Sequence, residues 1–122
     1  MAKEPVVGLS HLRITLSESF YIGPGRADLM ELIAETGSIS EAAKRMGMSY
    51  KRAWMLVQAL NDGFGAPLVE ASRGGKEQGA ALTVAGRDVL ERYRGMQEAT
   101  RRTIARDVDA LTRLHIDISS RK

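Results

Sequence analysis

Apolar side chains recur every three or four positions along most of this chain. That spacing gathers them into one stripe of a helix, which a water-soluble protein buries against its core. The pattern predicts four helices, at about residues 26–36, 39–46, 50–62 and 84–114. The chain is therefore expected to be mainly helical.

Capping residues mark the ends of these helices. A serine or threonine before a helix satisfies its first backbone N–H groups, and a glycine after it adopts the left-handed conformation that ends it. Ser38, with Glu41 three residues later, forms the capping-box pattern. The expected N-terminal caps are Ser38, Ser49 and Thr83, and the expected C-terminal glycines are Gly37, Gly47, Gly63 and Gly65.

Other segments alternate polar and apolar residues, which is typical of half-buried strands. In the first of them, Leu12, Ile14 and Leu16 share one face. A polar, glycine-rich loop at 73–79 separates the last two, which predicts a hairpin with a long basic tip. The first strand is expected at 11–17, and residues 20–22 either extend it or form a returning strand. The other two strands are expected at 67–71 and 80–82.

The order of these elements predicts a winged helix-turn-helix. In this motif a tight glycine turn sets a short helix steeply against a longer one, and here a hairpin follows. Ala42, Ala43 and Ala53 supply the small side chains needed where the two helices cross. The fold class is thus mainly α with a small β component. Its expected parts are a flexible arm (1–10), the winged helix-turn-helix (11–83), a long helix (84–115) and a tail (116–122).

The N-terminal end of the helix at 50–62 is suited to duplex DNA. Such a helix can enter the major groove, and its unpaired N–H groups attract phosphate. Between residues 41 and 52, four side chains are basic and one is acidic. The guanidinium of Arg52 has the shape to read guanine. The candidate contacts are Lys44, Arg45, Ser49, Tyr50, Lys51 and Arg52, with Arg73 and Lys76 at the hairpin tip.

Each of these signals also has an ordinary structural interpretation. Two adjacent basic residues on a helix usually belong to a solvated face, and a glycine-rich hairpin is usually a simple turn. Trp54 lies beside the buried stripe, so partial packing is a more common role for it than base contact. Only the combination of these elements in this order favours DNA binding.

Composition and charge narrow the function further. The 122 residues include no cysteine, which excludes disulfides and thiolate metal sites. With two histidines far apart and no Walker-type loop or nucleophile elbow, no enzyme activity, cofactor or metal is expected. A net charge of +3 and a pI near 9.5 fit an anionic partner. We expect a cytoplasmic protein, because neither a membrane span nor a secretory signal is present.

The run from Gly37 to Trp54 resembles the N-terminal DNA-binding domain of the ModE-type molybdate-responsive regulators. The likeness covers roughly residues 12–95. After the run from Gly37 to Trp54, it is carried by Pro67–Glu70, Gly74–Lys76 and Leu82–Thr83. The Ser-Tyr-Lys-Arg-Ala-Trp run (49–54) is fairly specific to this family, whereas the helix-turn-helix frame is also similar to LysR-type regulators.

The resemblance implies a transcriptional regulator that binds a palindromic operator near genes for molybdate transport or molybdoenzymes. It assigns the recognition role to residues 49–52, with Trp54, and the wing role to Arg73, Gly74, Gly75 and Lys76. Ser38 and Ser40, at the start of the preceding helix, complete the candidate DNA-binding set. The family also carries C-terminal oxyanion-binding domains, for which no sequence remains after Lys122, so a separate oxyanion sensor is expected.

The resemblance further implies a homodimer formed through the last helix. Apolar residues there follow a spacing close to a heptad, although Gln97, Thr100 and Asp107 interrupt it. The expected dimer contacts are Leu90, Tyr93, Met96, Ile104, Val108 and Leu111. The alternative to DNA binding, from another functional class, is a protein-interaction module. Such a module would dock a partner through this helix without touching DNA.

Overall fold

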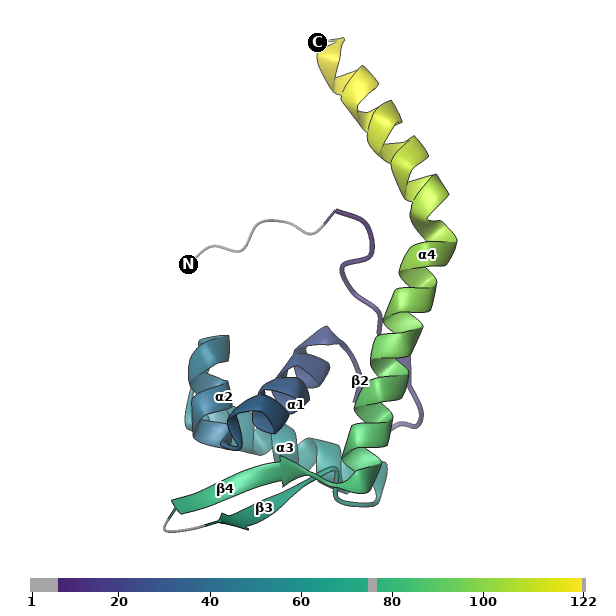
Figure 1. Ribbon diagram of the computed structural model, residues 1–122. Coiled ribbons are helices and arrows are strands. Elements are labelled where there is room, and N and C mark those ends of the chain that lie inside the picture. Colours follow the sequence, from purple (N-terminus) through teal and green to yellow (C-terminus); the bar gives the residue numbers. More distant parts are fainter. Residues whose placement is uncertain (1–6, 75–76, 122) are drawn as a thin grey trace.

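The computed structural model describes residues 7–74 and 77–121. In Figure 1, three short helices lie above a two-stranded hairpin, and a fourth, long helix rises past them to the C-terminal end. The elements are β1 (Ile14–Thr15), β2 (Tyr21–Ile22), α1 (Pro24–Thr36), α2 (Ile39–Met46), α3 (Tyr50–Phe64), β3 (Val69–Gly74), β4 (Glu77–Leu82) and α4 (Val84–Ser120). The predicted fold class, a winged helix-turn-helix followed by a long helix, is confirmed.

The predicted caps form most of the helix boundaries. The side-chain oxygens of Ser38, Ser49 and Thr83 accept the backbone N–H groups of Glu41, Arg52 and Gly86 at 3.0, 3.1 and 2.9 Å. Gly37, Gly47 and Gly65 follow α1, α2 and α3 with left-handed φ angles of 70°, 68° and 84°. Local capping thus marks the start of α2, α3 and α4 and the end of α1, α2 and α3.

Only half of the predicted capping box is present. The backbone N–H of Ser38 donates to the hydroxyl of Thr36 at 3.2 Å. The carboxylate of Glu41 lies 3.7 Å from Arg45 within α2. Glu41 therefore forms a surface ion pair along the helix, and Thr36 provides the remaining acceptor.

Gly63 lies within α3 and does not end the helix as predicted. A Cβ added at Gly63 would overlap the carbonyl oxygen of Ser19, in the turn between β1 and β2. Glycine at this position allows α3 to pass close to that backbone. The helix continues to Phe64, and Gly65 alone provides the left-handed C-cap.

The first strand is much shorter than predicted. Residues 14–15 pair antiparallel with residues 21–22, and between them the backbone N–H groups of Leu16 and Ser17 both donate to the carbonyl of Phe20. This tight reversal turns Leu16 outward, where it is 62% exposed. The alternation of apolar residues predicted the face of Leu12 and Ile14 but not the turn.

Two other boundaries extend beyond their predicted limits. The strands of the β3–β4 hairpin pair from Val69↔Leu82 out to Gly74↔Glu77, so much of the predicted loop at 73–79 is strand. The last helix continues to Ser120, through most of the segment predicted as a tail. None of the described helices is both long enough and apolar enough to cross a membrane.

The core lies where α1, α2, α3 and the hairpin meet. Ala42, Ala43 and Ala53 are buried where the helices cross, as their small size predicted. The other large core residues come from β2, α1, α3, the hairpin, α4 and the residues directly before β2 and β3: Phe20, Ile22, Leu29, Met30, Ile33, Val57, Leu60, Leu68, Val69, Leu82 and Tyr93. One apolar cluster therefore fixes the relative positions of all three short helices.

The prediction that Tyr93 contacts a second copy is wrong. Its side chain is fully buried within the chain, and its hydroxyl donates to the carbonyl of Leu12 at 2.6 Å. Burial raises the pKa of the Tyr93 hydroxyl, so this group remains a protonated donor. Leu90 packs partly on the same core. The first turns of α4 are thus part of the domain and do not form a free face.

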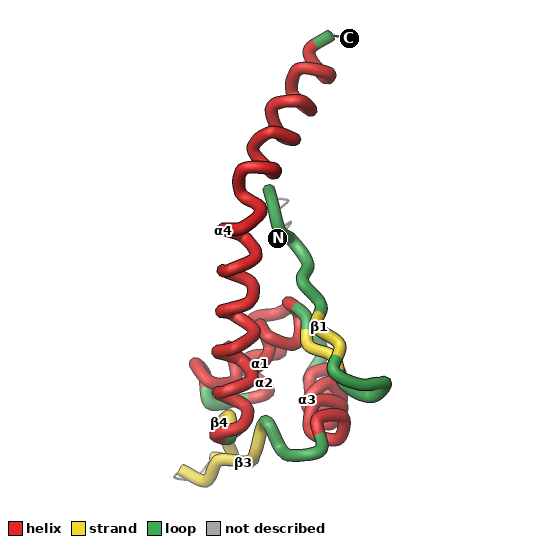
Figure 2. The backbone as a smooth tube through the Cα atoms, turned by 90° about the vertical axis from the view of Figure 1, so that its right-hand side faces the viewer, coloured by secondary structure: helices red, strands yellow, loops and turns green. Residues whose placement is uncertain are grey.

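Arg94 joins α4 to α1. Its guanidinium donates to Asp28 at 2.8 Å, to Glu31 at 3.1 Å and to Gln97 at 2.9 Å. Burial alone would lower the pKa of Arg94, but hydrogen bonding and charge from the two carboxylates outweigh it and raise the pKa. Arg94 and Tyr93 together hold α4 against the domain before it projects beyond it (Figure 2).

Gly86→Ala is expected to lower the free energy of unfolding by about 1–3 kcal/mol, because the added methyl group would overlap the Leu68 carbonyl and push α4 off the hairpin. Gly95→Ala is the matched control, since nothing lies within 4 Å of its added Cβ in the same helix. The free energy of unfolding of that variant should rise by up to about 1 kcal/mol, because alanine has a higher helix propensity than glycine. Urea unfolding at one protein concentration measures both, and equal effects would contradict the close packing at Gly86.

Candidate nucleic-acid interface

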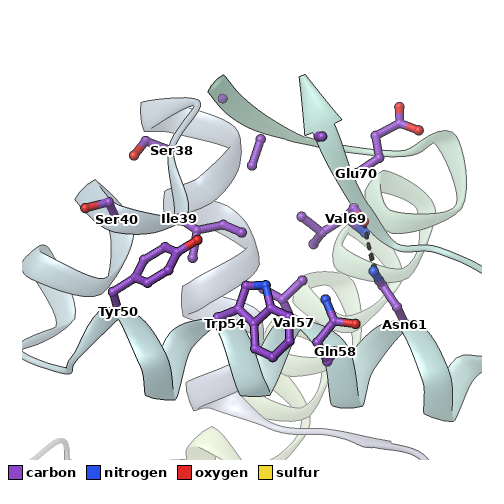
Figure 3. Close-up of a pocket in the computed structure, with 13 residues that line it drawn as sticks. Ser38, Ile39, Ser40, Tyr50, Trp54, Val57, Gln58, Asn61, Val69 and Glu70 are labelled. Atoms are coloured by element: carbon purple, nitrogen blue, oxygen red, sulfur yellow. Dashed lines mark hydrogen bonds between the residues drawn. The ribbon is translucent and has the colours of Figure 1, made fainter. Parts of the chain in front are cut away.

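An open cleft of about 380 Å³ lies between the start of α2, one side of α3 and the β3–β4 hairpin. Figure 3 shows α3 along one wall, with Ser38, Ile39 and Ser40 of the α2 region facing it and the hairpin closing one end. The remaining lining residues are Tyr50, Trp54, Val57, Gln58, Asn61, Val69, Glu70, Ala71, Gly79 and Ala80. Parts of the motif that are distant in sequence therefore meet at one surface.

Helix α3 contributes a line of larger side chains to this cleft. Tyr50, Trp54 and Gln58 are four residues apart, which places successive members about 6 Å along the helix on nearly the same side. All three project into the cleft in Figure 3. Tyr50 is 55% exposed and Trp54 46% exposed, so both rings remain largely free for a partner.

Asn61, one turn further along α3, fixes the hairpin. Its side-chain oxygen accepts the backbone N–H groups of Leu68 at 2.8 Å and Val69 at 3.1 Å, and its amide N–H donates to the Val69 carbonyl at 2.9 Å. Leu68 and Val69 are buried, so these backbone groups have little access to water. Asn61 thus sets the start of the hairpin relative to the exposed side of α3.

A second attachment joins the hairpin to the turn between α1 and α2. The backbone N–H of Ala80 donates to the carbonyl of Gly37 at 2.9 Å. A Cβ at Gly79 would lie 2.8 Å from that same oxygen, which explains why a glycine occupies the position. The hairpin is therefore held from both sides of the cleft.

The structure brings four of the predicted DNA-binding residues together: Ser38, Ser40, Tyr50 and Trp54 line the cleft. Ser49 caps α3, so its side-chain oxygen serves the helix itself. Lys44, Lys51 and Arg52 are exposed but do not line the cleft. The DNA-contact role of these three residues stays a prediction.

Arg45 faces a different part of the molecule. It lines a smaller cleft with Asp28 and Glu31 of α1 and pairs with Glu41 of its own helix. These carboxylates compete with phosphate for its charge. The contact of Arg45 with DNA stays a prediction.

The wing residues are described only in part. Arg73 and Gly74 end β3, where their backbones pair with Gln78 and Glu77. Gly75 and Lys76 lie outside the described residues. The wing role of all four stays a prediction.

The charges separate into a neutral-to-acidic cleft and basic surroundings. Among the described lining residues, Glu70 is the charged side chain, and no lysine or arginine joins it. Lys51 and Arg52 stand at the N-terminal end of α3, where the helix dipole adds positive potential. Phosphate is therefore favoured at the edges of this surface, whereas the cleft itself suits uncharged groups. The described residues also include no group of three histidine or acidic side chains that could hold a metal ion.

Sequence reasoning did not assign a role to Gln58, Asn61 or Glu70. An asparagine near the end of a helix was a usable signal for Asn61, because asparagine disfavours helix interiors and often bonds to nearby backbone. Nothing in the pattern distinguished Gln58 from an ordinary solvated helix residue. Its place in the cleft depends on the position of the hairpin.

The chain matches the family model described as bacterial regulatory helix-turn-helix protein, lysR family, over residues 27–87. It is 48% identical over 73 residues to the molybdenum-pterin-binding protein MopB of Rhodobacter capsulatus, covering 59% of this chain and 27% of that protein. It is 40% identical over 83 residues to the transcriptional regulator ModE of Haemophilus influenzae, covering 67% and 32%. The chain thus spans about a quarter to a third of the length of these curated relatives.

Solved structures show the same architecture. The complex of the CbnR DNA-binding domain with DNA superposes with a TM-score of 0.57 at 31% identity, covering 71% of this chain and 95% of that domain. Full-length CbnR, a LysR family transcriptional regulator, gives a TM-score of 0.54 at 31% identity, covering 68% of this chain and 27% of that protein. The match to the isolated domain accounts for nearly all of that domain.

Asn61→Leu is expected to lower the free energy of unfolding by about 2 kcal/mol or more, because it leaves three buried backbone groups without partners. Asp62→Leu is the control, since Asp62 is the exposed neighbour and should change stability by no more than about 0.5 kcal/mol. Amide hydrogen exchange should show faster exchange in β3 and β4 for Asn61→Leu alone. Unchanged hairpin protection would refute the anchoring role.

Proposed function

This chain belongs to the LysR family of bacterial regulatory helix-turn-helix proteins and is a DNA-binding regulator of the LysR and ModE type; on this premise, we propose that it binds a palindromic operator as a homodimer. Helix α3 enters the major groove, and the β3–β4 hairpin lies on the adjacent backbone or minor groove. Each half of the dimer occupies one half-site.

The observation that carries this proposal is the shared surface formed by α3, the start of α2 and the hairpin. An exposed helix fits the B-DNA major groove, which is about 12 Å wide. The N-terminal ends of α2 and α3 and the charges of Lys51 and Arg52 border this surface, where the two phosphate backbones would run. The alternative of partner docking without DNA gains no support from the relatives.

The C-terminal half of α4 provides the proposed dimer contact. Ile104, Leu111, Leu114 and Ile118 lie on one stripe of this helix at spacings of seven, three and four residues. Leu111 is 65% exposed, and Leu114 and Ile118 are also exposed. A monomer leaves this stripe in water, whereas a second copy of the same helix covers it.

The names of several relatives point to molybdenum. We propose that the regulated genes serve molybdate or related oxyanions. Neither cleft described above suits an oxyanion, because the larger has Glu70 as its charged residue and the smaller sets Asp28 and Glu31 beside Arg45. We propose that a separate sensor supplies the oxyanion signal. We place the protein in the cytoplasm, where a bacterial regulator meets its DNA.

Lys51→Gln is expected to weaken binding to every duplex by a similar factor and to reduce the slope of log affinity against log salt by about 1, because it removes one phosphate contact. Arg92→Gln is the control, since it removes one charge from α4, where Arg92 pairs with Asp88. Gel shifts at several salt concentrations measure both. Wild-type protein that binds duplex DNA without salt dependence would count against the proposed function.

Leu111→Asp is expected to convert the dimer to monomer at micromolar concentration, because a carboxylate replaces the centre of the apolar stripe. Ile116→Asp is the matched control: Ile116 is 59% exposed in the same helix but lies about 140° away around its axis. Analytical ultracentrifugation distinguishes the two. A monomeric wild type, or equal effects of both substitutions, would contradict pairing through this stripe.

A further inference from the structure

The side chains of α3 divide between two sides of the helix. Successive residues are rotated by about 100°, so Arg52 lies about 160° from Trp54 around the axis. Arg52 falls within about 20° of Gly63, whose backbone packs against Ser19 in the turn between β1 and β2. Arg52 therefore stands on the flank opposite the hairpin, and the cleft lining excludes it.

The side that faces the cleft carries different chemistry. We call Tyr50, Trp54 and Gln58 the α3 ridge, because they follow one another along the cleft wall (Figure 3). The ridge has no formal charge, and Gln58 makes no hydrogen bond to the other residues drawn there. An uncharged ridge gains nothing from phosphate contact alone. The indole ring of Trp54 and the free amide of Gln58 match base edges better than they match phosphate.

We propose that the α3 ridge reads the base sequence, with Gln58 binding an adenine and Trp54 packing on a thymine methyl group, while Arg52 contacts only the backbone. This rests on the proposed function and names the residues that give the same surface its sequence preference. A glutamine amide can bond adenine at N6 and N7 together, and an apolar side chain recognises the C5 methyl of thymine.

The geometry restricts the spacing of the two bases. Trp54 and Gln58 are four residues apart, about 6 Å along the helix. Base pairs of B-DNA are about 3.4 Å apart, so the thymine and the adenine lie about two base pairs from each other. Each half-site therefore contains an A·T-rich step opposite the middle of α3. A guanine read by Arg52 is not part of this arrangement.

Selection from a random duplex library with the whole chain tests which residues set the preference. Wild type is expected to enrich a motif with the paired adenine and thymine. Gln58→Ala should lose the preference for that adenine by roughly ten-fold, and Arg52→Ala should keep the motif with weaker binding. Circular dichroism and thermal unfolding check that each variant is folded.

Base analogues test the same contacts in the wild-type protein and need no variant to fold. Replacing the adenine by 7-deazaadenine removes N7, and replacing the thymine by uracil removes the methyl group; each should weaken wild-type binding several-fold. The 7-deaza change should have no further effect on Gln58→Ala, nor the uracil change on Trp54→Ala. Trp54 is the only tryptophan, so its fluorescence should respond to the uracil position in wild type.

The outcomes separate this inference from the function on which it rests. If wild type binds no duplex, both the proposed function and the base-reading role of the α3 ridge are refuted. If wild type binds a defined motif but the analogues and Gln58→Ala leave its base preference unchanged, the proposed function holds and the base-reading role of the α3 ridge is refuted. A motif whose guanine preference disappears in Arg52→Ala also refutes the ridge.

Discussion

The hydrogen bonds of the Asn61 amide are the interaction on which the proposed DNA-binding surface depends. They connect the cleft side of α3 to the first residues of the hairpin, and they satisfy backbone groups that have little access to water. Without a fixed hairpin, α3 would still be an amphipathic helix with a basic leading end. The cleft that aligns Tyr50, Trp54 and Gln58 beside the start of α2 would not have a defined shape.

The attachment of α4 has a comparable consequence for the dimer. Tyr93 and Arg94 bind the same helix that carries the exposed apolar stripe, one through the carbonyl of Leu12 and the other through Asp28 and Glu31. The orientation of the proposed dimer helix is therefore coupled to α1 and, through the core, to α3. In a symmetric dimer this coupling determines the distance and angle between two recognition helices, and hence the spacing of half-sites that the protein accepts.

The arrangement also separates affinity from selectivity. Lys51 and Arg52 lie in the first turn of α3, outside the cleft lining, and contacts of the kind proposed for them bind phosphate without regard to sequence. Glu70 lies within the lining and opposes a simple electrostatic attraction there. On the proposed arrangement, a surface that is basic at the end of α3 and uncharged along its cleft side binds duplexes in general and favours those with suitable base edges.

The sequence by itself determined the helices, their caps and the order of the motif, because these depend on contacts within a few residues. Ser38, Ser49 and Thr83 cap their helices wherever those helices pack. The tertiary structure alone decided three other matters: that Gly63 serves a close approach and not a helix end, that Tyr93 belongs to the core, and that Trp54 and Gln58 face the cleft while Arg52 does not. Each of these depends on a partner distant in the sequence: Ser19, Leu12 or the hairpin. Periodicity along a single helix identifies which residues share a face, but it contains no information about what lies opposite that face.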